Sequence, residues 1–166
     1  MTGARAHTPS WWDASVPPTR VALASDTYIG TSFKTTVDGK VLGFRIYLGN
    51  GDNNEHVAFL WNADTNVELA IFGFKPFVVG ALPAWRNAWC HPMVSVTAGV
   101  NYRLAILSFG NYYRTTNGLV APVTNNQIQF IQGWQTTGIN PRRASFGTNQ
   151  NANGVDILFC AAGTRC

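Results

Sequence analysis

The sequence predicts an all-β protein, a two-sheet antiparallel β-sandwich of the jelly-roll kind with an extended N-terminal arm. In residues 42–48, large apolar side chains stand at every second position, which is the period of a strand with one buried face. Turn signals such as Asp38-Gly39 and the Gly/Asn-rich residues 49–55 separate runs of this kind. Charged residues make up only 12% of the chain and aromatic residues 13%, a composition typical of strands and turns rather than helices.

The first 19 residues, MTGARAHTPSWWDASVPPT, predict an extended arm that precedes a sandwich domain at residues 20–166. Prolines, including Pro17 and Pro18, favour an extended chain, and no periodic pattern is present. The adjacent Trp11 and Trp12 are too apolar to stay in water. Either they pack on the chain's own sandwich or, together with the prolines, they dock into a neighbouring subunit, since Trp is enriched at interface hot spots.

Four strands are predicted in the first half of the chain, at residues 27–36, 42–48, 57–61 and 67–74. The first places Ile29 on the same face as Phe33. The third and fourth are expected to form a hairpin across the polar turn NADTN. The opening half therefore already contains a meander of alternating strands.

The second half is predicted to add a strand at 85–96, one at 101–109 that is buried on much of both faces, and a last strand at 155–162. Pro92 interrupts the first of these, so we expect an edge strand or a bulge there. Residues 110–154 are polar, and within them only 127–135 has the character of a strand. About eight strands and no helix are expected.

The loop at residues 110–118, which lies within the phrase FGNYYRTTNG of residues 109–118, is the strongest candidate binding element. Exposed Tyr112 and Tyr113 with Arg114 could stack on a sugar and bind its hydroxyl groups, and the same residue types suit a protein contact. The alternative is that Tyr112 only closes the end of the sandwich.

The sequence contains little that indicates catalysis. Among its eight carboxylates, Asp52 and Glu55 share one loop and are weak candidates for a calcium site or a glycosidase pair, but no EF-hand pattern surrounds them. Cys90 and His91 are adjacent on a predicted strand, so they point to opposite faces and cannot pair as nucleophile and base. We predict no catalytic residue, no metal and no cofactor, and therefore no enzyme.

Charge, hydropathy and cysteine usage restrict the partners and the cellular compartment that we expect for this chain. The net charge of +4 is scattered, and the only adjacent basic pair is Arg142-Arg143, so nucleic-acid binding is not expected. No apolar run reaches the ~20 residues of a membrane span, and the first ten residues lack the apolar core of a signal peptide. Cys160 is expected to pack as a small apolar side chain. A Cys160–Cys166 disulfide is an open alternative that no further feature of the sequence supports. Synthesis in a reducing cytoplasm is therefore expected.

The order of several phrases adds a resemblance. These are IGTSF, VDGKVLGFRIY and HVAFLW in the first half, then VSVTAGVNYRLA and VDILF in the second. Over residues 26–160 the chain resembles a β-sandwich domain family of unknown function, found in secreted bacterial modular proteins and in minor tail proteins of actinobacterial phages. The aromatic arm that ends in a Val-Pro phrase resembles the start of the phage proteins.

The resemblance implies a non-enzymatic structural virion protein, either a minor tail or a capsid-surface decoration component. We expect it to be made in the host cytoplasm and to assemble with other virion proteins, as a homo-oligomer, through its arm and aromatic loops. The alternative is a carbohydrate- or receptor-binding module at the cell surface, which would contact a host glycan through the tyrosine loop.

Overall fold

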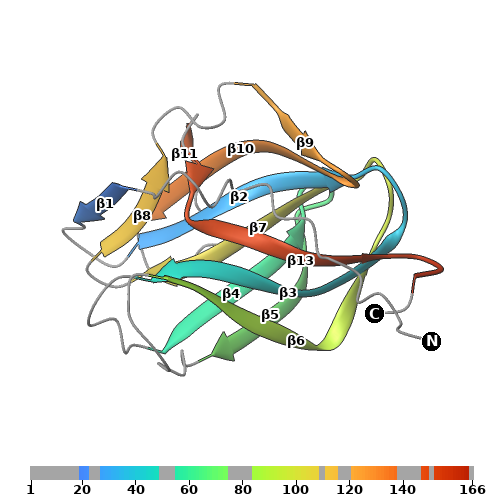
Figure 1. The fold of residues 1–166 in the computed structure, drawn as a ribbon, viewed down its shortest axis with the longest axis horizontal. Coiled ribbons are helices and arrows are strands. Elements are labelled where there is room, and N and C mark those ends of the chain that lie inside the picture. The colour runs from blue at the N-terminus through green and yellow to red at the C-terminus, as the bar shows by residue number, and fades with distance from the viewer. Residues whose placement is uncertain are drawn as a thin grey trace.

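The computed structural model describes residues 19–22, 27–48, 55–74, 84–108, 111–115, 121–137, 147–149 and 152–164. This part of the chain consists of strands and their connections (Figure 1), and none of it is a helix that could cross a membrane. In chain order the strands are β1 (Thr19–Ala22), β2 (Thr27–Thr35), β3 (Gly39–Leu48), β4 (His56–Asn62), β5 (Val67–Phe74), β6 (Ala84–Val96), β7 (Asn101–Ser108), β8 (Asn111–Thr115), β9 (Val123–Asn125), β10 (Ile128–Thr137), β11 (Gly147–Asn149), β12 (Ala152–Asn153) and β13 (Val155–Ala161).

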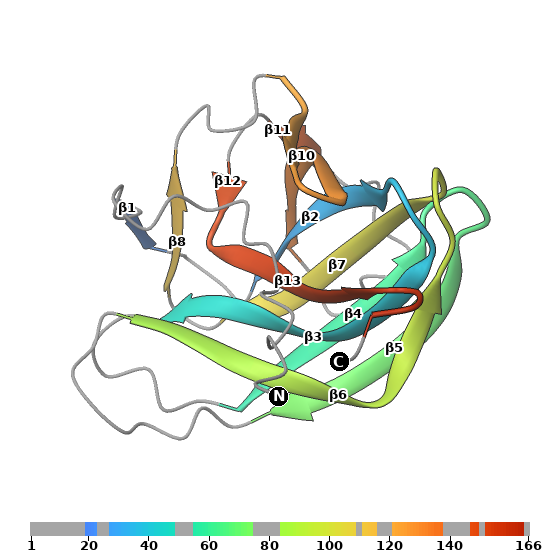
Figure 2. The same cartoon turned by 45° about the vertical axis from the view of Figure 1, so that its right-hand side comes forward.

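Two antiparallel sheets pack face to face, which confirms the predicted sandwich. The larger sheet has the order β11-β10-β2-β7-β4-β5, with β9 also paired to β10, and the smaller has the order β13-β3-β6. A third sheet, β1-β8-β12, lies at one end of the sandwich, on the left in Figures 1 and 2. The hairpin predicted between residues 57–61 and 67–74 is present as the β4–β5 pair.

The space between the two main sheets is filled by the alternating apolar side chains of their inner faces. Phe33 of β2 stacks on Tyr102 of β7 with ring centres 5.6 Å apart, and Phe44 of β3 lies 5.1 Å from Phe72 of β5. Phe159 from the last strand is also enclosed in this core. Burial of these faces is what the period-two pattern of the sequence requires.

The outer face of the larger sheet carries a second buried cluster, formed by Tyr28, Trp61, Ala105 and Trp134. Its assembly depends on Gly30: a Cβ atom there would lie only 1.9 Å from the Leu104 carbonyl oxygen and 2.6 Å from the indole of Trp134. The indole therefore lies directly over the glycine. As a result β2 and β7 are buried on both faces, which confirms the expectation for residues 101–109.

Strand β6 is an edge strand, as Pro92 predicted. It pairs only with β3 among the described strands, and its register shifts where Trp89 faces Gly43 and Val94 faces Val41. The four residues between Trp89 and Val94, including Pro92, thus stand opposite a single residue of β3. The proline lacks an N–H group and is tolerated at such a bulge.

Two predictions about the second half are wrong. Residues 110–154 contain β8, β9, β11 and β12 besides β10, because these short polar strands are held by pairing with β1, β8 or β10 rather than by an apolar face. Cys160 is not a free apolar thiol: it is buried and disulfide-bonded, while Cys90 is the free cysteine. Cys166 lies outside the described residues.

Candidate functional site

Most of the predicted assembly and metal residues cannot be compared with the structure. Trp11, Trp12, Pro17, Pro18 and Asp52 lie outside the described residues. Glu55, the other candidate of the acidic loop, is exposed just before β4. Among the described residues no group of three or more His, Cys, Asp or Glu side chains could hold a metal ion.

The predicted tyrosine loop is a strand. Tyr112, Tyr113 and Arg114 belong to β8, where they pair in register with Val21, Arg20 and Thr19 of β1. The prediction that these residues form a loop is therefore wrong, because it overlooked the pairing with β1.

His56 and Cys90 are both buried in the described part of the chain. His56 is fully buried, and its Nδ1 lies 3.0 Å from the carbonyl oxygen of Leu107. Cys90 is buried in the core while His91 is exposed, which confirms that the two point to opposite faces. Burial raises the pKa of the Cys90 thiol to about 12, so it stays protonated and is a poor nucleophile at neutral pH.

The structure instead places aromatic side chains on the outer face of the smaller sheet. Ala88 and Cys90 of β6 point into the core, so the alternate residues Trp85, Asn87 and Trp89 lie on the outer face. We call these three residues the β6 strip. Trp89 is 65% exposed, and Asn87 is exposed beside it. Trp85 and Trp89 are about 13 Å apart along the strand, at ~3.3 Å per residue.

Trp85 is held in place by its neighbours on β3. The ring of Tyr47 meets it edge-on with centres 5.5 Å apart, and the Arg45 guanidinium lies 4.8 Å from its ring centre. Arg45 also donates hydrogen bonds from Nε and Nη2 to Oδ2 of Asp156, the former at 3.2 Å. Asp156 is fully buried, and its Oδ1 accepts a hydrogen bond from the Ile157 amide at 2.7 Å. One end of the strip is therefore rigid.

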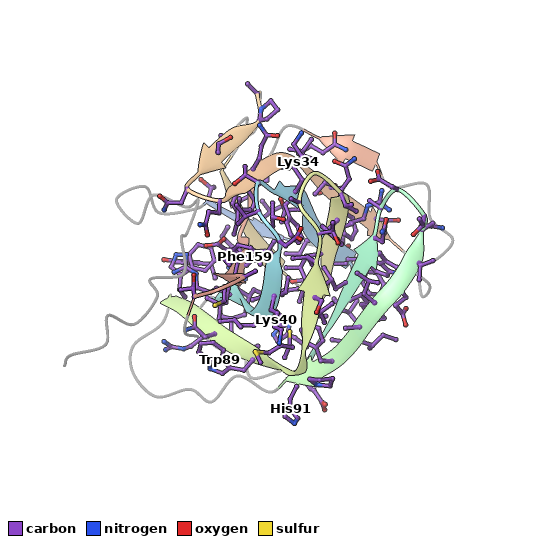
Figure 3. All side chains as sticks on the ribbon, turned by 90° about the vertical axis from the view of Figure 1, so that its right-hand side faces the viewer. Lys34, Lys40, Trp89, His91 and Phe159 are labelled. Carbon is purple, nitrogen blue, oxygen red and sulfur yellow. The ribbon has the colours of Figure 1, made fainter. Side chains whose placement is uncertain are left out.

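Beyond the bulge at Pro92 the same face opens into a hollow of about 480 Å³. Its walls include Lys40, Met93, Ser95 and Thr97 together with the C-terminal turn after β13. Lys40 is exposed and faces Ser95 across the strand pair. In Figure 3, Trp89 and His91 project from the β6 margin of the molecule, while Lys40 lies between them and the enclosed Phe159.

The edge strand of the larger sheet has a different character. Strand β5 ends the larger sheet and pairs only with β4 among the described strands. Its sequence, VELAIFGF, contains no proline and no lysine. Val67, Leu69 and Ile71 are all exposed, Ile71 by 48%. Strand β5 thus combines an edge that no further described strand pairs with and exposed apolar side chains.

Comparison with known proteins places the chain in a family without assigning it an activity. No curated protein matches the chain. The profile described as "Domain of unknown function (DUF4082)" matches residues 14–154, which is most of the sequence. The resemblance noted in the order of the sequence phrases thus corresponds to a domain family. The chain belongs to the DUF4082 family of domains of unknown function.

Proposed function

We propose that the chain is a non-enzymatic structural component of a phage virion, at the tail or on the capsid surface, which works by binding other proteins. The observation that supports it best is the exposed edge of β5. The resemblance of the N-terminal arm to those of phage tail proteins supports the proposal that the chain is part of a virion.

An unprotected edge strand is rare in a protein that works alone. Edge strands present unpaired N–H and C=O groups, and natural proteins usually guard them with lysine, proline or a bulge. β5 has a register irregularity between the partners of Leu60 and Trp61, but its pairing from Ala70 to Phe74 is regular. Such an edge can add a strand from another chain, with main-chain hydrogen bonds for affinity and side chains such as Ile71 for selectivity.

The test compares two variants that place a charge on the edge strands of the two different sheets. Ile71→Lys on β5 should prevent incorporation into virions, because a charged side chain at a pairing edge opposes strand addition. Met93→Lys, at a residue with a similar exposure of 46% on β6, is the matched control and should be incorporated like the wild type. Circular dichroism confirms that both are folded. Normal incorporation of Ile71→Lys would contradict assembly through β5.

Deletion of residues 1–18 tests the predicted role of the arm separately. The shortened chain keeps every described strand, so the sandwich should fold. We expect it to be absent from virions and to have a lower mass by light scattering than the full chain. If the shortened chain enters particles normally, the arm is not an assembly element.

The alternative function, a carbohydrate- or receptor-binding module, is favoured by one observation, the exposed Trp89 on a strand. The tyrosine site first predicted for it is tested by Tyr112→Ala and Tyr113→Ala. Unchanged binding of glycans or cell surfaces by both variants would remove that site from consideration.

A further inference from the structure

We propose that the β6 strip, Trp85, Asn87 and Trp89, is a binding site for an extended oligosaccharide. The site is distinct from the β5 edge and does not depend on the proposal that the chain is a virion component. It is argued from the exposure of the indole, the spacing of the aromatic residues and the chemistry of the strand edge.

The exposure of Trp89 is the first observation. Trp is a highly buried residue on average, yet this side chain is 65% exposed on a strand fixed in a sheet. Its neighbour across the strand pair is Gly43, which has no side chain to cover the ring. A flat aromatic face of this kind can stack on the apolar C–H face of a pyranose ring.

The second observation is the order of side chains along the strand. Asn87 lies between the two tryptophans, and it makes no side-chain hydrogen bond to the described part of the chain. Its amide can both donate to and accept from sugar hydroxyl groups. Because Trp85 and Trp89 stand about 13 Å apart, one sugar ring cannot reach both, and the strip fits a chain of sugars.

The third observation is rigidity. Arg45 and Tyr47 pack on Trp85, and Arg45 is itself fixed by the buried Asp156. A side chain already held in one orientation loses little conformational entropy when a ligand binds. Trp85 is half-buried and already has Arg45 over its ring, so it supplies a fixed end to the site, and the exposed Trp89 supplies most of the contact area.

The strand edge favours a glycan over a protein strand. Pro92 and the four-residue bulge interrupt β6, so a partner strand could not pair along it as it could along β5. The exposed neighbours of Trp89 on this face are mostly polar, with Asn87 before it and Ser95 and Lys40 beyond the bulge. Protein hot spots, by contrast, are surrounded by contacts that exclude water. The Lys40 ammonium and the Ser95 hydroxyl can donate to sugar oxygens that extend into the hollow.

Affinity electrophoresis tests the proposal with the full chain. Native gels contain hydroxyethylcellulose, laminarin, galactomannan or arabinogalactan, and slowed migration reports binding. We expect at least one polysaccharide to retard the wild type. Trp89→Ala should weaken that binding about tenfold or more, the size of loss typical of a hot-spot aromatic. Trp89→Phe should retain part of it, because it keeps a ring, and Asn87→Ala should weaken it less.

Ile71→Ala is the matched control, since it removes an exposed apolar group from the edge strand of the other sheet and should bind like the wild type. Failure of all four polysaccharides to retard the wild type would overturn the proposal, and so would unchanged binding by Trp89→Ala. If Trp89→Ala instead lowers the mass of the protein in light scattering, the strip binds protein and the proposal is wrong. None of these results bears on the Ile71→Lys test of virion assembly.

Discussion

The ion pair between Arg45 and Asp156, next to Trp85, allows us to predict how much unfolding free energy is lost when it is broken. Asp156 has no exposed surface, and its carboxylate is satisfied by Arg45 and by the Ile157 amide. In Arg45→Met an unbranched apolar stem is kept, but the guanidinium over Trp85 is lost and the buried carboxylate loses its cationic partner. The variant therefore removes the charge while most of the side-chain stem remains.

Removal of one partner from a buried ion pair typically costs 3–5 kcal/mol of unfolding free energy. The Arg45 side chain is 21% exposed, so water partly solvates the pair and the lower end of the range applies. We expect a loss of about 3 kcal/mol. At an m-value of about 2 kcal/mol/M, the urea midpoint would fall by about 1.5 M.

Urea unfolding followed by tryptophan fluorescence measures this loss. Lys40→Met is the control, because Lys40 is an exposed cation of the same strand and should change stability by no more than about 0.5 kcal/mol. The double variant Arg45→Met/Asp156→Asn should lose about 2 kcal/mol less than the sum of its single variants, as expected for groups in contact. A loss under about 1 kcal/mol for Arg45→Met, or an equal loss for Lys40→Met, would refute this account of the pair.

Three further predictions concern the core, the free thiol and a surface turn. Gly30→Ala should destabilise the protein by about 3 kcal/mol or prevent folding, since the new Cβ would meet the Leu104 carbonyl and the Trp134 indole, and thermal unfolding measures this. Cys90, with a pKa raised to about 12 by burial, should resist iodoacetamide in the native protein at pH 8 and react once the protein is unfolded in urea; equal rates in the two states would contradict the burial. The pKa of Asp64 is lowered because its carboxylate accepts hydrogen bonds from the side chain and the backbone amide of Asn101, the first residue of β7. The stabilising contribution of Asp64 is therefore present above the ordinary pKa of an aspartate, and it is lost as the pH falls through the lower pKa of the folded state. In Asp64→Asn that part of the acid dependence should vanish from urea midpoints measured between pH 5 and pH 2.

The strands with one buried face could be predicted from the sequence, since burial itself imposes the alternation. The break at Pro92 likewise predicted an edge, because a residue without an N–H group cannot pair on both sides. The short strands β8, β11 and β12 could not be predicted in this way. They have two to five residues and lack an apolar face, and only their partners in the folded chain define them.

The face of the sheet on which each tryptophan lies could not be predicted from the sequence pattern either. Phe130 and Trp134 are four residues apart and should share a face, but a bulge between Phe130 and Gln132 moves Trp134 to the outer face of the larger sheet. Trp89 stands between Ala88 and Cys90, and the inward orientation of these two side chains places Trp89 on the outer face. Because one extra residue reverses every later side chain of a strand, the aromatic sites required the structure.

The pairing of β3 with β13 has a consequence for how the chain folds. Arg45 and Asp156 are 111 residues apart in the sequence. The smaller sheet contains β13, β3 and β6 among the described strands, so it needs the last of the described strands to be complete. Until β13 has been made, the edge of β3 that pairs with it has no partner strand. Proteins dominated by such distant contacts fold in milliseconds to seconds rather than microseconds. A chain shortened before β13 should accordingly aggregate rather than persist as a smaller domain.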